Sequence, residues 1–289
     1  MKILLTGSNG FIGRNLAEKL CVDYKVEAPG RMELDLTDEQ AVETYLDRNN
    51  FDIIIHAANA SNTRNADITR YRLLDGNLRM FFNLERCSEL YGRMYYFGSG
   101  AEYDMRHYVP GMKEGYFGMH VPEDPYGLSK YAMAKTSEKS RNIYDLCLFG
   151  VYGKYEEYER RFISNAICRV LTGRDITIRK NVYFDYLWID DLCEIMRWFL
   201  EHEPKRKRYN VCRGSKIDLY SLAKIVKKLL HADCGIQVKE PGWKPEYSGN
   251  NQRLLQEMGS FIFTGYEESI QRLCCYYKTN MHLIDVNRI

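Results

Sequence analysis

The sequence predicts an α/β protein with a doubly wound parallel sheet and a smaller α/β C-terminal lobe, and three stretches carry this prediction. Residues 2–6 and 51–56 are short apolar runs without polar alternation, which is typical of strands buried on both faces. The first run leads directly into a glycine-rich turn and an amphipathic helix that reaches about Leu20. A strand, a glycine turn and a helix in this order form a dinucleotide-binding unit, so we expect a Rossmann-like sheet.

The glycine-rich turn spans residues 7–13, with the spacing Gly-x-x-Gly-x-x-Gly in place of the more usual Gly-x-Gly-x-x-Gly. Glycine allows the backbone to approach a pyrophosphate closely, and the helix that follows offers free N–H groups and the positive end of its dipole. We therefore expect cofactor contacts from Gly7, Asn9, Gly10, Phe11, Ile12 and Gly13.

The second strand, near residues 25–28, ends at Pro29-Gly30-Arg31. An NAD-specific site of this fold needs a carboxylate here to bind the ribose 2′-hydroxyl, and the next acid is Glu33. The guanidinium of Arg31 can pair with a 2′-phosphate instead. The sequence therefore favours NADP over NAD, with a solvent-exposed turn arginine as the alternative.

The third strand, residues 51–56, closes with Ala57-Ala58-Asn59. Small residues at this end of a strand leave room for a cofactor at the edge where doubly wound sheets bind ligands. His56 ends the apolar run, and we interpret it as a packed core histidine. A long helix is expected next, from about Asp67 to Tyr91.

Tyr126 and Lys130 lie four residues apart, which places both side chains on one face of a helix. A lysine ammonium in this position can lower the pKa of a phenol, ordinarily about 10, so that the phenol exchanges protons with a substrate oxygen. Spacing alone is weak support, because it recurs in two other pairs, Tyr131/Lys135 and Tyr220/Lys224.

The context of the pair resembles the extended short-chain dehydrogenase/reductase family, the NAD-dependent epimerases, dehydratases and reductases of nucleotide sugars. The strand near residues 94–98 ends in a serine loop, and Glu102-Tyr103-Asp104 matches the Val-Tyr-Gly-like corner of that family. This match implies that Ser99 is the catalytic hydroxyl beside Tyr126 and Lys130, the latter two also contacting the cofactor. The resemblance implies further cofactor-site residues: Asp35, Leu36, Ala57, Ala58 and Asn77. For Asn77, a solvent-exposed side chain with no part in the site is an equal alternative.

The substrate side departs from the family pattern. Cys147 stands in place of an arginine, Gly150 in place of an asparagine, and Phe184 where an arginine often grips the nucleotide diphosphate. The expected substrate contacts are Ser99, Gly100, Arg161 and Arg179, with Lys180 as a further candidate cation. We expect a dinucleotide-binding domain of residues 1–150 plus about 185–212, and a substrate lobe of about 151–184 plus 213–289.

Residues that other members of the family carry and this chain lacks narrow the choice of reactions. Dehydratases of the family carry an acidic pair directly after the catalytic hydroxyl, where this chain has Gly100 and Ala101. Reductases that also epimerise neighbouring carbons carry a cysteine at the position of Ala101. An NADPH-dependent 4-keto-deoxysugar reductase and a 4-epimerase with tightly bound NAD remain. A non-catalytic NADP(H)-binding regulatory protein is the third hypothesis, although such relatives usually lose the tyrosine or the lysine.

Composition sets further bounds. The formal charge of +2 argues against nucleic acid as the main partner, and the basic run 205–208 is interpreted as a solvated loop. Nine cysteines without a Cys-x-x-Cys spacing indicate neither a metal site nor a disulfide framework. Without a signal peptide or an 18-residue apolar span, we expect a reduced cytoplasmic protein with no membrane contact. The resemblance also implies a possible homodimer through the helices near 67–91 and 126–141.

Overall fold

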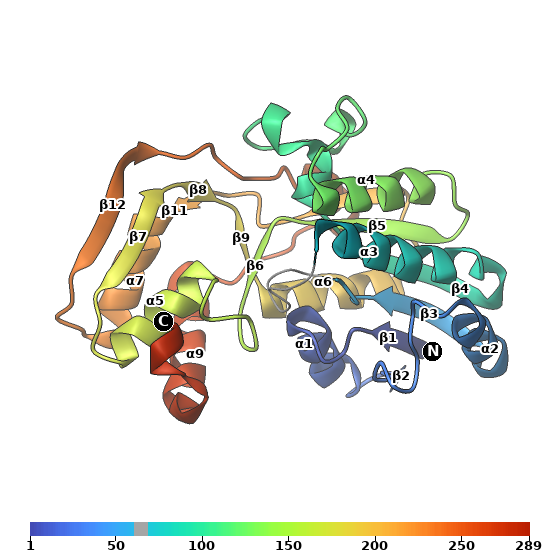
Figure 1. The fold of residues 1–289 in the computed structure, drawn as a ribbon, viewed down its shortest axis with the longest axis horizontal. Coiled ribbons are helices and arrows are strands. Elements are labelled where there is room, and N and C mark those ends of the chain that lie inside the picture. The colour runs from blue at the N-terminus through green and yellow to red at the C-terminus, as the bar shows by residue number, and fades with distance from the viewer. Residues whose placement is uncertain (61–68) are drawn as a thin grey trace.

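The computed structural model describes residues 1–60 and 69–289 and confirms the doubly wound α/β architecture (Figure 1). A six-stranded sheet has the spatial order β10-β5-β4-β3-β1-β2, and all of its neighbouring strands run parallel. Its strands are β1 (Lys2–Thr6), β2 (Lys25–Glu27), β3 (Phe51–His56), β4 (Tyr91–Ser99), β5 (Ile143–Leu148) and β10 (Arg208–Val211). Because β2 and β3 flank β1 on opposite sides, the strand order reverses there, and ligands bind at such a reversal.

Helices cover both faces of the sheet, which explains the continuous apolar runs of its strands. Ile3 and Leu5 of β1 pack with α1 (Phe11–Leu20) and α6 (Ile189–Glu201) on one face. Leu4 points to the other face, which is covered by α2 (Glu39–Asn49), α3 (Arg70–Glu85) and α4 (Pro125–Ser137).

The remaining elements form smaller two-stranded sheets and helices, with β7, β12, α5, α7 and α9 gathered at the left of the view in Figure 1. They are β6 (Gly150–Tyr152), α5 (Phe162–Leu171), β7 (Ile176–Asn181), β8 (Tyr183–Phe184), β9 (Tyr186–Trp188), β11 (Ile217–Asp218), α7 (Leu219–Leu230), β12 (Ile236–Trp243), α8 (Gln252–Met258) and α9 (Tyr266–Thr279). The domain boundaries given above stay a prediction.

The helix expected to reach Tyr91 is shorter than predicted. Helix α3 ends at Glu85, and Tyr91 already belongs to β4, where it pairs with Phe51 of β3. A side chain at Gly92 would lie 2.5 Å from the carbonyl oxygen of Asp52, so a glycine is required where β4 joins the sheet. The expected start near Asp67 lies outside the described residues.

The interpretation of residues 205–208 as a solvated loop is wrong for Arg208. Lys205 and Arg206 are exposed, whereas Arg208 opens β10 and is only 4% exposed. Its charge is paired inside the protein with Asp145 of β5, at 2.8 Å from Nε to Oδ2. A run of four basic residues does not reveal such a partner.

All nine cysteines are free thiols. Within residues 1–60 and 69–289, no group of three or more potential metal ligands occurs. The same part of the chain contains no helix of the length and apolarity that a membrane span needs.

Candidate active site

The turn after β1 is a cradle that only glycine can form. Gly7 has a φ of +70°, and a Cβ there would lie 2.5 Å from the backbone nitrogen of Ala58. A Cβ at Gly13 would lie 2.1 Å from the carbonyl oxygen of Gly7. The turn closes through a 2.9 Å hydrogen bond from the Gly10 N–H to the Gly7 carbonyl, and α1 begins directly after it. The backbone therefore leaves room for a phosphate at the N-terminus of α1.

A cavity of about 950 Å³ opens over this cradle at the reversal point of the sheet. Its lining brings together ten of the predicted cofactor residues: Gly7, Asn9, Gly10, Phe11, Ile12, Arg31, Asp35, Leu36, Ala57 and Ala58. Gly13 contributes by closing the turn from behind. The volume and the glycine cradle fit a dinucleotide.

Arg31 lies at the β2 end of this cavity with its side chain 80% exposed. Its Nε lies 3.2 Å from Oδ2 of Asp35. Asp35 in turn accepts hydrogen bonds from the N–H and the hydroxyl of Thr37, at 2.9 and 2.7 Å. These bonds and the nearby guanidinium lower the pKa of Asp35. An ionised Asp35 holds Arg31 at the cavity while leaving most of the guanidinium accessible to a ligand.

Asn77 of α3 is 2% exposed, so the alternative of a solvent-exposed asparagine is wrong. Its Oδ1 accepts from the Ala60 N–H at 2.7 Å, and its Nδ2 donates to the Ala60 carbonyl at 3.2 Å. Asn77 therefore fixes the segment that leaves β3 and borders the cavity, although its own side chain is not part of the lining.

Ser99, Tyr126 and Lys130 converge beside the carboxyl end of β4. Ser99 is the last residue of β4, and its side chain lies close enough to Tyr126 to lower the pKa of the phenol against the effect of burial. Helix α4 begins with Pro125 and is capped by Asp124, whose Oδ1 accepts from the Gly127 N–H at 2.7 Å. This start places Tyr126 in the first turn of the helix, facing the end of the sheet.

Lys130 is 4% exposed, and its Nζ donates to the Phe97 carbonyl at 2.8 Å. Nζ lies 5.8 Å from the centre of the Tyr126 ring. Burial lowers the pKa of Lys130 to about 8, opposed by the negative charges of Asp145 and Glu102. The lysine thus retains a charge near neutral pH because acidic groups lie close to it.

The pKa of Tyr126 is raised by burial, while the nearby Ser99 side chain and the positive charge of Arg161 act in the lowering direction. The expected net lowering of the phenol pKa is therefore not what the surroundings produce. Burial of the phenol outweighs the nearby cations, and Tyr126 is held as a protonated phenol near neutral pH.

The two other Tyr/Lys pairs lie in different surroundings. Tyr131 packs against Phe117 at 5.0 Å between ring centres, and Lys135 lies over the same Phe117 ring. Tyr220 and Lys224 belong to α7, outside the central sheet. His56 is also not a proton donor near neutral pH, because burial lowers its pKa to about 3 while its Nδ1 contacts Oγ1 of Thr6 at 2.8 Å.

Tyr247 is a site residue that the sequence did not predict. Its hydroxyl lies near Ser99, where a Cβ on Gly100 would approach it to 2.4 Å, and Ser99 acts on the pKa of this phenol. The Tyr247 ring packs against Phe149 and Phe184, at 5.4 and 5.5 Å between ring centres. Tyr247 lies in a stretch without periodicity, so no sequence signal connected it to Ser99.

Arg161 lines the cavity, and it is the only one of the candidate substrate cations to do so in the part of the chain that the structure describes. Its charge also acts on Tyr126. Arg179 lies on β7 with its side chain 78% exposed, and it pairs with Glu240 of β12 at 2.6 Å. Lys180 occupies the next position of the same strand.

A glycine cradle on a doubly wound sheet, with a serine, a tyrosine and a lysine at the neighbouring strand end, defines a nicotinamide-dinucleotide site of the short-chain dehydrogenase/reductase class. Comparison with known proteins identifies the family. Residues 3–212 match the model of the NAD dependent epimerase/dehydratase family, and the chain belongs to it.

Individual relatives extend over the whole chain. The chain is similar to the GDP-L-colitose synthase of Yersinia pseudotuberculosis, at 25% identity over 96% of this chain and 98% of that protein. Its fold resembles a Campylobacter jejuni GDP-mannoheptose C4 reductase solved with NADP, with a TM-score of 0.83, 19% identity and coverage of 96% and 98%. It also resembles a UDP-glucose 4-epimerase of Thermotoga maritima, with a TM-score of 0.81, 19% identity and coverage of 97% and 100%.

Proposed function

We propose that this protein is an NADPH-dependent reductase of a GDP-linked 4-keto-deoxysugar. The observation that carries the proposal is the convergence of Ser99 at the end of β4 with Tyr126 and Lys130 on α4, where Lys130 is buried with its Nζ 5.8 Å from the centre of the Tyr126 ring. The names of the Yersinia and Campylobacter proteins support GDP as the nucleotide and C4 as the reacting carbon.

The glycine turn and Arg31 would hold the phosphates of NADPH, whose reduced nicotinamide would supply the hydride for the C4 carbonyl carbon. Tyr126 gives its hydroxyl proton to the C4 oxygen, which completes the alcohol, and Ser99 donates a hydrogen bond to the same oxygen. Lys130 stabilises the phenolate that Tyr126 becomes. A phenol whose pKa is raised by burial is protonated at neutral pH, which is the form that reduction requires.

Arg31 supports NADPH as the cofactor. Its guanidinium is accessible at the cavity and is held there by Asp35. In this role it binds the 2′-phosphate of NADPH, which NADH lacks. Arg31→Ala is expected to weaken NADPH binding and to leave NADH binding nearly unchanged, in a fluorescence titration. Arg79→Ala is the matched control, because Arg79 also borders the cavity and is likewise paired with an acid four residues away, Asp75 at 2.9 Å, but lies on α3 and not at the end of β2.

Arg161 is our candidate for the substrate diphosphate, since Phe184 stands where the family often has an arginine. It borders the cavity and acts electrostatically on Tyr126. Arg161→Ala is expected to raise KM for the nucleotide sugar more than tenfold. Arg179→Ala serves as the control, because Arg179 is already paired with Glu240. An equal effect of both variants would contradict this assignment.

The decisive experiment identifies the cofactor and then the reaction. Denatured protein is analysed by mass for a released dinucleotide, and emptied protein is titrated with NADPH and NADH. NADPH oxidation is then followed with a GDP-linked 4-keto-6-deoxyhexose in deuterated water. Preference for NADPH and a product without deuterium at the neighbouring carbons support the reductase.

The 4-epimerase is the alternative, supported by the fold similarity to the UDP-glucose 4-epimerase. Stoichiometric NAD released from the purified protein, with interconversion of 4-hydroxyl epimers and no net oxidation of NADPH, would replace the reductase by this function. Dinucleotide binding without turnover of either substrate type would favour the regulatory protein.

A further inference from the structure

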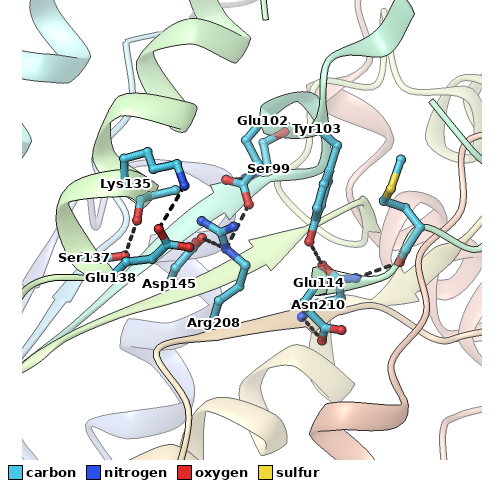
Figure 2. Close-up of polar contacts among 12 residues, drawn as sticks. Ser99, Glu102, Tyr103, Glu114, Lys135, Ser137, Glu138, Asp145, Arg208 and Asn210 are labelled. Atoms are coloured by element: carbon cyan, nitrogen blue, oxygen red, sulfur yellow. Dashed lines mark hydrogen bonds and ion pairs between the residues drawn. The ribbon is translucent and has the colours of Figure 1, made fainter. Parts of the chain in front are cut away.

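Three charged side chains are buried directly behind Ser99. Glu102 and Asp145 are each 0% exposed, and Arg208 is 4% exposed. They come from the 3₁₀ turn Gly100–Tyr103, from β5 and from β10. Figure 2 shows the Arg208 guanidinium between the two carboxyl groups, with its Nε 2.8 Å from Asp145 Oδ2 and 3.5 Å from Glu102 Oε1.

The strand that carries Ser99, β4, has a glycine at the position where these carboxyl groups pack against it. A Cβ at Gly98 would lie 2.1 Å from Oδ1 of Asp145 and 3.0 Å from Oε2 of Glu102. Residue 98 must therefore be glycine for the carboxyls to occupy this place. The network and the end of β4 form one packed unit.

Glu102 also holds Ser99 by hydrogen bonds. Its Oε2 accepts from the Ser99 N–H at 3.4 Å, while Oγ of Ser99 accepts from the Ala101 N–H at 3.3 Å. These reciprocal bonds form a capping box around the turn that follows β4. The position of the Ser99 hydroxyl thus depends on the carboxyl group of Glu102.

Among the described residues, the hydrogen bonds of this network are incomplete on both sides, since Nη1 and Nη2 of Arg208 are buried without an acceptor. Oε1 of Glu102 and Oδ1 of Asp145 are buried without a hydrogen-bond partner when both groups are treated as acceptors only. The two carboxyls lie close together, because Oδ1 of Asp145 and Oε2 of Glu102 both approach the Cβ position of Gly98 and both groups pair with Nε of Arg208. One proton between them satisfies both, because a protonated carboxyl donates. It also removes the repulsion of two negative charges that face a single guanidinium.

We propose that Glu102 and Asp145 share one proton, present a single negative charge to Arg208, and act as positioning residues for Ser99 and Lys130. Glu102 holds the proton, and Asp145 is the ionised partner of Arg208. Glu102 orients Ser99 through the capping box, and the charge of the pair keeps Lys130 as an ammonium. The effect on turnover rests on the proposed reductase function.

The directions of the pKa shifts agree with this assignment. Burial raises the pKa of Glu102 well above its ordinary value, with the charge of Asp145 acting in the same direction. Burial also raises the pKa of Asp145, but the charge of Arg208 and its hydrogen bond oppose that rise. The other titratable groups that interact with the pair, with Arg208 or with Lys130 are His56, Tyr96, Tyr103, Tyr126, Cys147 and Tyr247.

The protonation state is tested without activity, by infrared difference spectroscopy of the wild type against single variants at neutral pH. Glu102→Gln is expected to remove the carbonyl band of a protonated carboxyl. Asp145→Asn is expected to remove the same band, because Glu102 then ionises to pair with Arg208. Glu114→Gln is the matched control, since Glu114 is buried beside β10 and accepts from the Asn210 N–H at 3.0 Å. Loss of an ionised carboxylate band in Glu102→Gln would overturn the proposal.

The positioning role is tested by the pH dependence of kcat for the reductase. Each single variant keeps one ionised carboxyl near Lys130. The pH at the midpoint of the basic limb is therefore expected to stay within a few tenths of a unit of the wild-type value. The double variant Glu102→Gln/Asp145→Asn removes the charge, and the basic limb is expected to move to lower pH by about one unit. An unchanged limb in a folded double variant would overturn the role.

Two further outcomes are distinguishable. If the double variant does not fold, Glu102→Ala replaces it: loss of the capping box is expected to lower kcat at least tenfold while NADPH affinity is kept, and an unchanged kcat overturns the positioning of Ser99. If the wild type reduces no GDP-linked 4-keto sugar, the proposed function fails. The infrared result still decides whether the pair shares a proton.

Discussion

At the scale of single residues, the proposed reduction depends on the phenol proton of Tyr126. Tyr126→Phe keeps the ring and removes that proton. We expect kcat to fall by about 10² to 10⁴-fold, the usual contribution of a general acid, with NADPH affinity changed less than twofold. Steady-state kinetics and a cofactor titration measure the two effects.

Tyr131→Phe is the matched control, because it removes a hydroxyl from the next Tyr/Lys pair of the same helix. Its ring packs on Phe117, and that packing is kept. The control is expected to retain wild-type kcat. Equal losses in both variants would mean that Tyr126 contributes to the structure of α4 and not to proton transfer.

Gly100 and Tyr247 form a second pair that can be tested residue by residue. A methyl group at Gly100 collides with the Tyr247 hydroxyl, at 2.4 Å, and also approaches the Phe149 ring, at 2.9 Å. Gly100→Ala is therefore expected to lower kcat/KM at least tenfold by displacing Tyr247 from Ser99. Adding Tyr247→Phe removes the nearer atom and is expected to recover part of that loss. Strictly additive losses in this double-mutant cycle would contradict the contact.

At the scale of elements, the turn between β1 and α1 is the part that we propose holds the cofactor phosphates. Gly13→Ala places a methyl group 2.1 Å from the carbonyl of Gly7, so the turn must open. We expect NADPH affinity to fall by at least tenfold. Gly30 borders the same cavity, but a Cβ there would meet no atom within 4 Å. The Gly30→Ala variant is therefore expected to bind NADPH with wild-type affinity. Isothermal titration of both variants checks this, and normal binding by Gly13→Ala would contradict the cradle.

The sequence predicted this element and its neighbours well because their signals are local. The strands Lys2–Thr6 and Phe51–His56 and the end of α1 at Leu20 agree with the predicted boundaries, since apolar runs and periodicity depend on neighbouring residues only. The capping of α2 by Asp38, whose Oδ1 accepts from Ala41 at 3.0 Å, was likewise predictable from residue type.

Features that depend on distant partners were not predictable from the sequence. Arg208 belongs to a basic run, and only its pairing with Asp145 across β10 and β5 shows that it is buried. Tyr247 reaches Ser99 from the far end of the chain. In both cases the decisive contact joins segments that share no local pattern.

At the scale of the whole molecule, His56 couples the stability of the fold to pH. Burial between β1 and β4 lowers its pKa to about 3, whereas an unfolded histidine has a pKa of about 6.5. Between these values the unfolded chain binds one more proton than the folded protein. The free energy of unfolding therefore falls as the pH drops through this window, by up to about 1.4 kcal/mol per pH unit from this residue.

His56→Asn removes that titration and is expected to flatten the dependence of stability on pH between 6.5 and 4. The substitution itself loses packing and lowers stability at pH 7, so the comparison uses the slope and not the absolute value. Urea unfolding at several pH values gives both slopes. Buried carboxyls such as Glu156, whose pKa is raised to about 8 by burial, titrate in both proteins and cancel in the difference. His282→Asn changes an exposed histidine and is expected to keep the wild-type slope, and an equally steep slope in His56→Asn would contradict the buried neutral imidazole.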